Sequence, residues 1–115
     1  MRRLVLFLTL ACLIVQIPPE QVLRVIDGDT FILMTFDVPP ETRIRVLGVD
    51  TPERGEPGYA EAGAFTRAWL AQGPFTVTTC ERDSLLRRLA WIERGSNGLH
   101  TALIDSGHGV VRTGR

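Results

Sequence analysis

The sequence predicts one mainly β domain with inserted helices, built on a small, curved, barrel-like sheet of five strands. Two observations carry this prediction: five short segments show the apolar content and two-residue period of strands, and two others show helical spacing or helix-end signals. The chain has 115 residues, of which 44% are hydrophobic, so it is long enough for one compact core and too short for two domains. We therefore expect a single folded unit that acts as a monomer.

The N-terminal segment MRRLVLFLTLACLIVQ places two arginines before an uncharged, mostly apolar run from Leu4 to Val15. This pattern is typical of a signal peptide, and the run is shorter than the about 20 apolar residues that a membrane span needs. Our first expectation is export with removal of residues 1–16, which leaves a domain of residues 17–115. An uncleaved N-terminal membrane anchor is the second interpretation, and a buried first strand or helix of the domain is the third.

Cysteine, histidine and charge content limit the chemistry. Without residues 1–16, Cys80 is the only cysteine, so the expected mature domain has no internal disulfide. His100 and His108 lack the paired spacing of a zinc site. Acidic and basic residues balance at 13 each and every basic residue is arginine, so any phosphate recognition would need a local arginine cluster.

The first two strands are expected at residues 21–26 and 29–36. Asp27 and Gly28 between them form a tight-turn signal, because glycine adopts backbone angles that are closed to other residues. The third strand is expected at residues 42–49, TRIRVLGV, where arginines alternate with aliphatic residues in a two-residue period.

An amphipathic helix is expected in GYAEAGAFTRAWLAQG, residues 58–73. Pro57 lies near its start and Gly73 lies at its end, which is the usual placement of these residues around a helix. The apolar face of this helix is expected to contain residues at helical spacing, namely Ala64, Phe65, Ala68 and Trp69.

Two further strands are expected at FTVTTC, residues 75–80, and RLAWIER, residues 88–94. A short helix from Leu99 to Ser106 follows the GSNG turn and stops at Gly107. Five strands with a helix inserted after the third fit an OB-type barrel.

Chemically interesting residues concentrate in RVLGVDTPE, residues 45–53. Asp50 and Glu53 are separated by Thr51 and the rigid Pro52, so the two carboxylates can lie on the same side of a turn at the end of a strand. Taken alone, this run also suits a helix start, with Asp50 as the cap and Glu53 three residues later. Considered in isolation, this run is better explained by a structural role than by a catalytic one. Its combination with the other motifs of the chain favours the catalytic role.

Four segments in order resemble the staphylococcal nuclease (thermonuclease) family: RVIDGDTF, RIRVLGVDTPE, the helix with its Ala/Phe/Trp face, and RDSLLRRLAWI. The resemblance covers residues 22 to about 112. It implies a five-stranded Greek-key OB-fold phosphodiesterase that uses calcium to hydrolyse DNA and RNA and leaves 3'-phosphates.

The resemblance implies a calcium site in which Asp29 and Asp50 are carboxylate ligands and the backbone carbonyl of Thr51 is a third oxygen. Asp27 would lie in the outer shell. A hard cation prefers oxygen ligands and completes its shell with water, one molecule of which can become the nucleophile.

The resemblance also implies roles for three residues that act on the substrate. Arg45 and Arg87 would grip the phosphate, because arginine forks match the oxygens that gain negative charge. Glu53 would position or deprotonate the attacking water.

One departure from the family concerns the loop before Arg87. The usual Asp-x-Tyr-Gly-Arg run is replaced by Asp83-Ser84-Leu85-Leu86-Arg87. Leucine resists the left-handed turn conformation that glycine permits, so we expect a rearranged loop that moves Arg87 or lets Arg88 substitute for it. A second hypothesis is therefore a noncatalytic OB module that binds nucleic acid or another protein.

Overall fold

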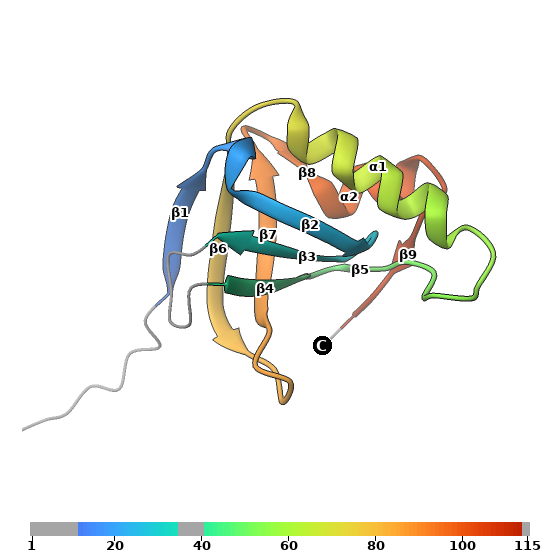
Figure 1. Cartoon of the computed structure of the whole chain (residues 1–115), viewed down its shortest axis with the longest axis horizontal. Helices are drawn as coiled ribbons and strands as arrows, with labels where there is room; N and C mark the ends of the chain where they lie inside the picture. Colours follow the sequence, from blue (N-terminus) through green and yellow to red (C-terminus); the bar gives the residue numbers. More distant parts are fainter. Residues whose placement is uncertain (1–11, 35–40, 114–115) are drawn as a thin grey trace, which may run out of the picture.

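The computed structural model describes residues 12–34 and 41–113 of the chain. These residues form a mainly β fold of the α+β class, with one large mixed sheet and two helices that lie together beside one end of it (Figure 1). The elements in chain order are β1 (Leu13–Ile17), η1 (Pro19–Gln21), β2 (Val22–Asp27), β3 (Thr30–Met34), β4 (Glu41–Val46), β5 (Val49–Asp50), α1 (Tyr59–Ala71), β6 (Phe75–Arg82), β7 (Arg88–Arg94), β8 (Asn97–Gly98), α2 (Leu99–Asp105) and β9 (Val110–Val111).

The large sheet has the strand order β1-β6-β7-β4-β3-β2, and β8 pairs with β7. Its neighbouring strands are antiparallel except β4 and β7, which are parallel, and β5 and β9 form a separate two-stranded sheet. Within the described residues no ladder joins β1 to β2, so the sheet is not closed into a barrel. The mainly β prediction with inserted helices is confirmed.

The core lies between the sheet and the helices. Phe31 of β3 and Phe75 of β6 meet edge to face with ring centroids 6.2 Å apart. Leu70 of α1 and Leu103 of α2 are both buried in the same cluster. Burial of these side chains fixes both helices against the sheet, because removing apolar area from water is the main favourable term in folding.

Most strands lie where the two-residue period predicts them. β7 has the expected bounds, and β6 begins at Phe75 as expected and continues to Arg82. The expected third strand is interrupted: a turn with Gly48 at a φ of +86° separates β4 from β5. Residues 35–36, the expected end of the second strand, lie outside the described residues.

Both predicted helices are present, and the predicted buried face of α1 is confirmed for Trp69 but wrong for Ala64 and Ala68. Ala64 and Ala68 are exposed, and Phe65 is only half-buried. Thr66 turns inward instead, because its hydroxyl donates a hydrogen bond of 2.6 Å to the carbonyl oxygen of Gly28. The buried residues of α1 are Ala62, Gly63, Thr66, Trp69 and Leu70.

The expected boundary after residue 16 falls inside β1, whose five residues pair with β6. Ile17 is only 1% exposed and belongs to the core. Among our three interpretations of the N-terminal segment, the first-strand interpretation matches what residues 13–17 form. Residues 1–11 lie outside the described residues, and the helices that the structure describes are each too short or too polar to cross a membrane.

Cys12, directly before β1, forms a disulfide with Cys80 of β6. The expectation that Cys80 has no partner for an internal disulfide is therefore wrong. Its error came from placing Cys12 in a removed leader.

Candidate functional site

Asp27 and Gly28 form the turn between β2 and β3, as the sequence predicts. The backbone N–H of Asp29 donates to Oδ1 of Asp27 at 3.1 Å, which closes the turn. Gly28 is packed against two neighbours: a Cβ there would lie 2.7 Å from Cγ2 of Thr51 and 2.9 Å from Cβ of Ala62. Glycine is therefore required because the turn, helix α1 and the segment after β5 approach each other closely.

Asp29 is 6% exposed, and both of its carboxylate oxygens have partners. Oδ2 accepts hydrogen bonds from the backbone N–H of Thr51 at 2.9 Å and from its hydroxyl at 3.1 Å. Oδ1 accepts a bond of 3.0 Å from the hydroxyl of Thr30. Two sequence-predicted site residues that are 22 positions apart, Asp29 and Thr51, are thus in direct contact.

Arg45 forms ion pairs with two acidic residues of the predicted site, Asp29 and Asp50. It is 6% exposed, and its Nη1 donates to the carbonyl oxygens of Val46 at 2.6 Å and Val49 at 2.9 Å. Its Nη2 donates to Oδ1 of Asp50 at 2.6 Å. Nη1 also lies 3.6 Å from Oδ2 of Asp29, so one guanidinium pairs with both predicted ligand carboxylates.

Arg112 is a site residue that the sequence analysis missed. Its Nη1 donates to Oδ1 of Asp50 at 3.2 Å, and its backbone N–H donates to the carbonyl oxygen of Gly48 at 3.1 Å. The pairing of β9 with β5 brings it there. A two-residue strand carries no periodic signal, so only the tertiary structure places Arg112 beside Asp50.

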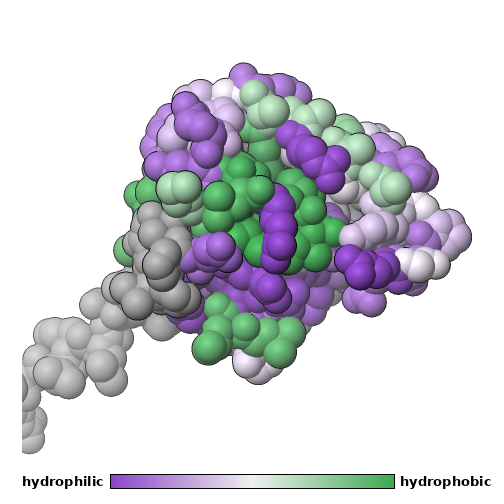
Figure 2. All heavy atoms as spheres, viewed as in Figure 1, coloured by the Kyte–Doolittle hydropathy of each residue, from purple (hydrophilic) through white to green (hydrophobic). Residues whose placement is uncertain are grey.

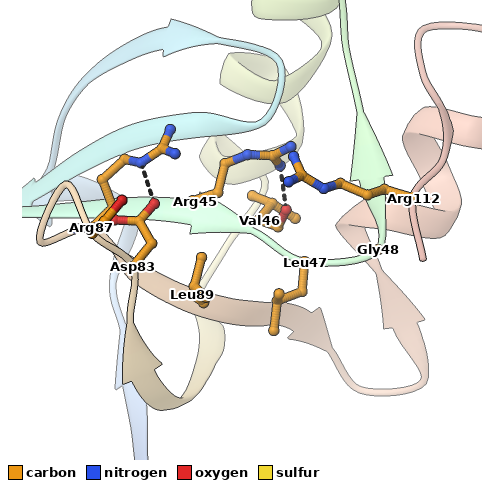
Figure 3. A pocket seen from close by; sticks show the side chains of 9 residues that line it. Arg45, Val46, Leu47, Gly48, Asp83, Arg87, Leu89 and Arg112 are labelled. Carbon is orange, nitrogen blue, oxygen red and sulfur yellow. Dashed lines mark hydrogen bonds and ion pairs between the residues drawn. The ribbon is translucent and has the colours of Figure 1, made fainter. Parts of the chain in front are cut away.

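Arg87 lies across a pocket of about 220 Å³ from Arg112, with Arg45 between them (Figure 3). Its Nε donates to Oδ2 of Asp83 at 2.7 Å, and its backbone N–H donates to Oδ1 of the same carboxylate at 2.9 Å. Burial alone would raise the pKa of Asp83, but these hydrogen bonds from Arg87 lower it below its usual value. The sequence-predicted pair, Arg45 and Arg87, therefore lines one pocket.

The loop before Arg87 keeps a left-handed residue in spite of the leucine. Leu86 has a φ of +64°, the one positive value at a non-glycine among the described residues. Leucine at such an angle costs about 1–2 kcal/mol. With the loop in this strained conformation, Arg87 lines the pocket together with Arg45. The expected displacement of Arg87 stays a prediction.

Glu53 and Asp27 lie at the margins of the site. Glu53 is exposed and lines a shallow hollow together with Asp50, Thr51 and Arg112. Arg112 also lines the pocket that contains Arg45 and Arg87, which we call the arginine pocket. Burial and the neighbouring Asp29 carboxylate raise the pKa of Asp27 to about 6. Asp27 thus retains a proton more readily than an exposed aspartate does.

The donor set of this site suits a hard cation, because carboxylate and carbonyl oxygens are the ligands that calcium prefers. Oδ2 of Asp50 accepts no hydrogen bond from the described residues. Groups of three or more His, Cys, Asp or Glu side chains with metal-binding geometry are absent from residues 12–34 and 41–113. The rings of His100 and His108 pack against those of Trp91 and Phe65, respectively.

Comparison of the chain with models of known protein families found no match. Comparison with curated proteins also found none.

Proposed function

We propose that this chain is a calcium-dependent endonuclease that hydrolyses DNA and RNA to products with 3'-phosphates. The observation that carries the proposal is the position of Arg45, which pairs with Asp29 and Asp50 and lines the same pocket as Arg87. Phosphodiester hydrolysis needs a metal ion that activates water and cationic groups that stabilise the phosphate oxygens. The carboxylates could hold the ion, and the neighbouring arginines could bind the phosphate.

Asp29, Asp50 and the carbonyl of Thr51 would hold the calcium ion, with Asp27 in the outer shell. When bound, calcium would polarise a phosphate oxygen and make water more acidic. Asp29 is oriented by three hydrogen bonds from Thr30 and Thr51, so this ligand is held in place before any ion arrives.

The protein's own residues would then bind and neutralise the substrate. Arg87 uses Nε for Asp83, and no hydrogen bond from its Nη1 or Nη2 to a described residue is present. These donors can grip equatorial phosphate oxygens, and Arg45 can add charge from the far wall. Glu53 is exposed at the edge of the hollow next to Asp50, where it can accept a proton from a water molecule.

We also propose that the five strands β2, β3, β4, β7 and β6 correspond to those of an OB-type fold, whose barrel is only partly closed. Their order, with the parallel pair β4 and β7 and with α1 inserted after β5, supports this assignment. In this reading β1 is an additional strand on the outer edge of β6.

We propose that the protein is exported and monomeric. The Cys12–Cys80 disulfide supports an oxidising compartment, where such bonds persist. Removal of residues 1–16 would delete most of β1 and break the Cys12–Cys80 disulfide, so we propose that any cleavage precedes Cys12. An uncleaved N-terminal anchor remains the alternative.

A DNA zymogram of the purified chain with and without calcium tests the proposal. We expect clearing that needs calcium and is stopped by chelation, with RNA degraded as well. Asp50→Ala and Glu53→Ala should each lower turnover by at least about 10²-fold, the usual contribution of a catalytic base or more. Undiminished activity in either variant would contradict the assigned roles. Glu61→Ala, which changes an exposed carboxylate on α1, is the matched control.

The second candidate is a noncatalytic module that binds nucleic acid or a protein. The observation that favours it is the pairing of Arg87 with Asp83 next to the strained Leu86, which ties this guanidinium to the protein. Binding without turnover at high calcium would support it. Recovery of turnover after Leu85→Tyr with Leu86→Gly would show that the loop alone had prevented catalysis.

A further inference from the structure

Arg112, directly after β9, lines both hollows of the candidate site. It forms part of the wall of the arginine pocket, and it borders the shallow hollow that contains Glu53. Among the described residues, no other lines both of these hollows. The anion pocket and the part of the proposed site that contains the catalytic base therefore meet at this side chain.

Three guanidinium groups lie along the arginine pocket, which has a volume of about 220 Å³. Figure 3 shows the side chain of Arg112 extending toward that of Arg45, with Arg87 on the other side of Arg45. Asp83 is the only acidic residue among the described residues that line this pocket. Arginine forks match the oxygens of a phosphate, so the wall of the pocket suits an anion.

The guanidinium of Arg112 keeps most of its donors for a ligand. Its Nη1 donates to Oδ1 of Asp50 at 3.2 Å, and neither Nη2 nor Nε donates to a described residue. Both Nη atoms of Arg45, by contrast, already donate to Val46, Val49 and Asp50. Arg112 is therefore better able than Arg45 to form a paired contact with two phosphate oxygens.

The contacts that hold the chain in place at Arg112 do not need its side chain. Its backbone N–H donates to the carbonyl oxygen of Gly48 at 3.1 Å, and β9 pairs with β5. Asp50 already accepts a shorter bond of 2.6 Å from Nη2 of Arg45. The side chains of the Arg112–Asp50 pair are 35% and 50% exposed, and ion pairs of this kind contribute little to stability. A role in folding alone therefore does not account for the arginine.

The charge of Arg112 is balanced only while Asp50 is free to pair with it. In the structure Arg112 shares Oδ1 of Asp50 with Arg45. When Asp50 ligates a divalent cation, its negative charge no longer compensates the guanidinium. A phosphate beside Arg112 would restore the balance, so binding of the cation and binding of the substrate would favour each other.

We propose that Arg112 is a third arginine that binds the substrate phosphate, together with Arg45 and Arg87. This inference rests on the proposed function, because it takes a nucleic-acid phosphodiester as the ligand. Nη2 and Nε of Arg112 donate to the phosphate oxygens and hold the phosphate at the border with the hollow of Glu53. The side chain transfers no proton, since arginine stays charged in proteins.

Binding of a fluorescein-labelled single-stranded oligothymidylate, in buffer with a chelator, tests this contact without hydrolysis. We expect Arg112→Gln to raise the Kd about tenfold or more at low salt, the usual effect of losing a hydrogen bond between charged groups. The slope of log affinity against log salt concentration should become shallower by about 0.7, the value for one phosphate contact to a single strand.

Two further variants separate the phosphate contact from a general charge effect. Arg112→Lys should restore the slope but not the full affinity, because lysine keeps the charge and lacks the fork. Arg67→Gln, which removes an exposed arginine from α1, is the matched control and should change neither quantity. Equal affinity and slope in the parent and Arg112→Gln, or a parent that does not bind the oligonucleotide, would overturn the proposal.

Calcium affinity, measured by calorimetry, separates the contact from an effect on the fold. Arg112→Gln removes a cation next to Asp50 and should bind calcium about two- to fivefold more tightly, the range expected for a partly exposed ion pair. Weaker binding of both calcium and oligonucleotide would show that Arg112 acts through the fold, and it would overturn the proposal. Oligonucleotide binding that depends on Arg112, without turnover by the parent in calcium, would support the phosphate contact and contradict only the nuclease activity.

Discussion

The cluster around Arg45 and the tip of the β6–β7 hairpin, Leu85 and Leu86, both contain side chains in surroundings that are unfavourable for them. They differ in whether the protein compensates for this. In the cluster, the buried charges of Asp29 and Arg45 are offset by hydrogen bonds within the protein. At the tip, the exposed Leu85 and Leu86 have no such compensation among the described residues. The charges of the cluster are therefore compensated within the protein, whereas the tip keeps two apolar side chains in water. This difference predicts which substitutions reduce stability and which leave it nearly unchanged.

The largest effect is expected for Arg45→Ala. It would leave the carboxylate of Asp29 buried without its cation, which typically costs about 3–5 kcal/mol. The free energy of unfolding from urea titration is the measurement. Arg43→Ala removes an exposed arginine from the same strand and should change stability by less than about 0.5 kcal/mol. Equal losses in the two variants would show that the cluster is not internally compensated.

Gly28→Ala should rank second. The added methyl group would lie 2.7 Å from Cγ2 of Thr51 and force the turn away from it. Such overpacking typically costs about 1–3 kcal/mol. Gly63→Ala on α1 is the control, because its Cβ would meet nothing within 4 Å, and it should raise stability slightly. Thermal unfolding of both variants measures the difference, and a Gly28→Ala variant as stable as Gly63→Ala would be inconsistent with close packing at this turn.

Asp83→Asn should have a smaller, pH-dependent effect. Hydrogen bonds from Arg87 lower the pKa of Asp83 below 3.8, so the folded state binds this proton less tightly than the unfolded state. The stabilising contribution is therefore present above about pH 4 and is lost as pH falls through the folded-state pKa. Because the pair is partly solvated, we expect a loss of about 0.5–1 kcal/mol at neutral pH.

Urea titrations of the parent and of Asp83→Asn at neutral pH and near pH 3 measure this contribution. The difference between the two proteins should shrink at the lower pH. A difference that stays constant or grows on acidification would mean that Asp83 is not stabilised in its charged form.

The smallest effect is expected for Leu86→Gly. Relief of the left-handed leucine gains about 1–2 kcal/mol, and the flexibility of glycine in the unfolded chain costs about 0.5–1 kcal/mol. The melting temperature should stay the same or rise by a few degrees. A clear drop in melting temperature would indicate that Leu86 stabilises the fold. The tip would then not differ from the cluster in its contribution to stability.

The features that depend on local sequence patterns were predicted correctly. The alternation of β7 and the end signals of α2 gave their positions, and the Asp27–Gly28 turn was found from its residue types. The buried face of α1 was predicted correctly at Trp69 but not at Thr66, which is buried with a hydrogen bond to the distant Gly28 that hydropathy does not reveal.

The candidate site shows the same limit. Asp29, Asp50 and Arg45 were named from motifs, and the structure brings them into contact. Arg112 was missed because its position depends on the pairing of β9 with β5, and a two-residue strand has no detectable period. The disulfide of Cys12 was missed because an apolar leader and an apolar edge strand look alike in a single sequence.

The disulfide between Cys12 and Cys80 ties β1 to the outer edge of β6, and the two cysteines are 68 positions apart in the chain. If β1 detached, the backbone donors and acceptors along that side of β6 would be open to strands of other molecules, which is how edge strands promote aggregation. Oxidation of one thiol pair therefore keeps this side of β6 covered, and a chain kept in a reducing environment would depend on the pairing of the five residues of β1 alone to cover it.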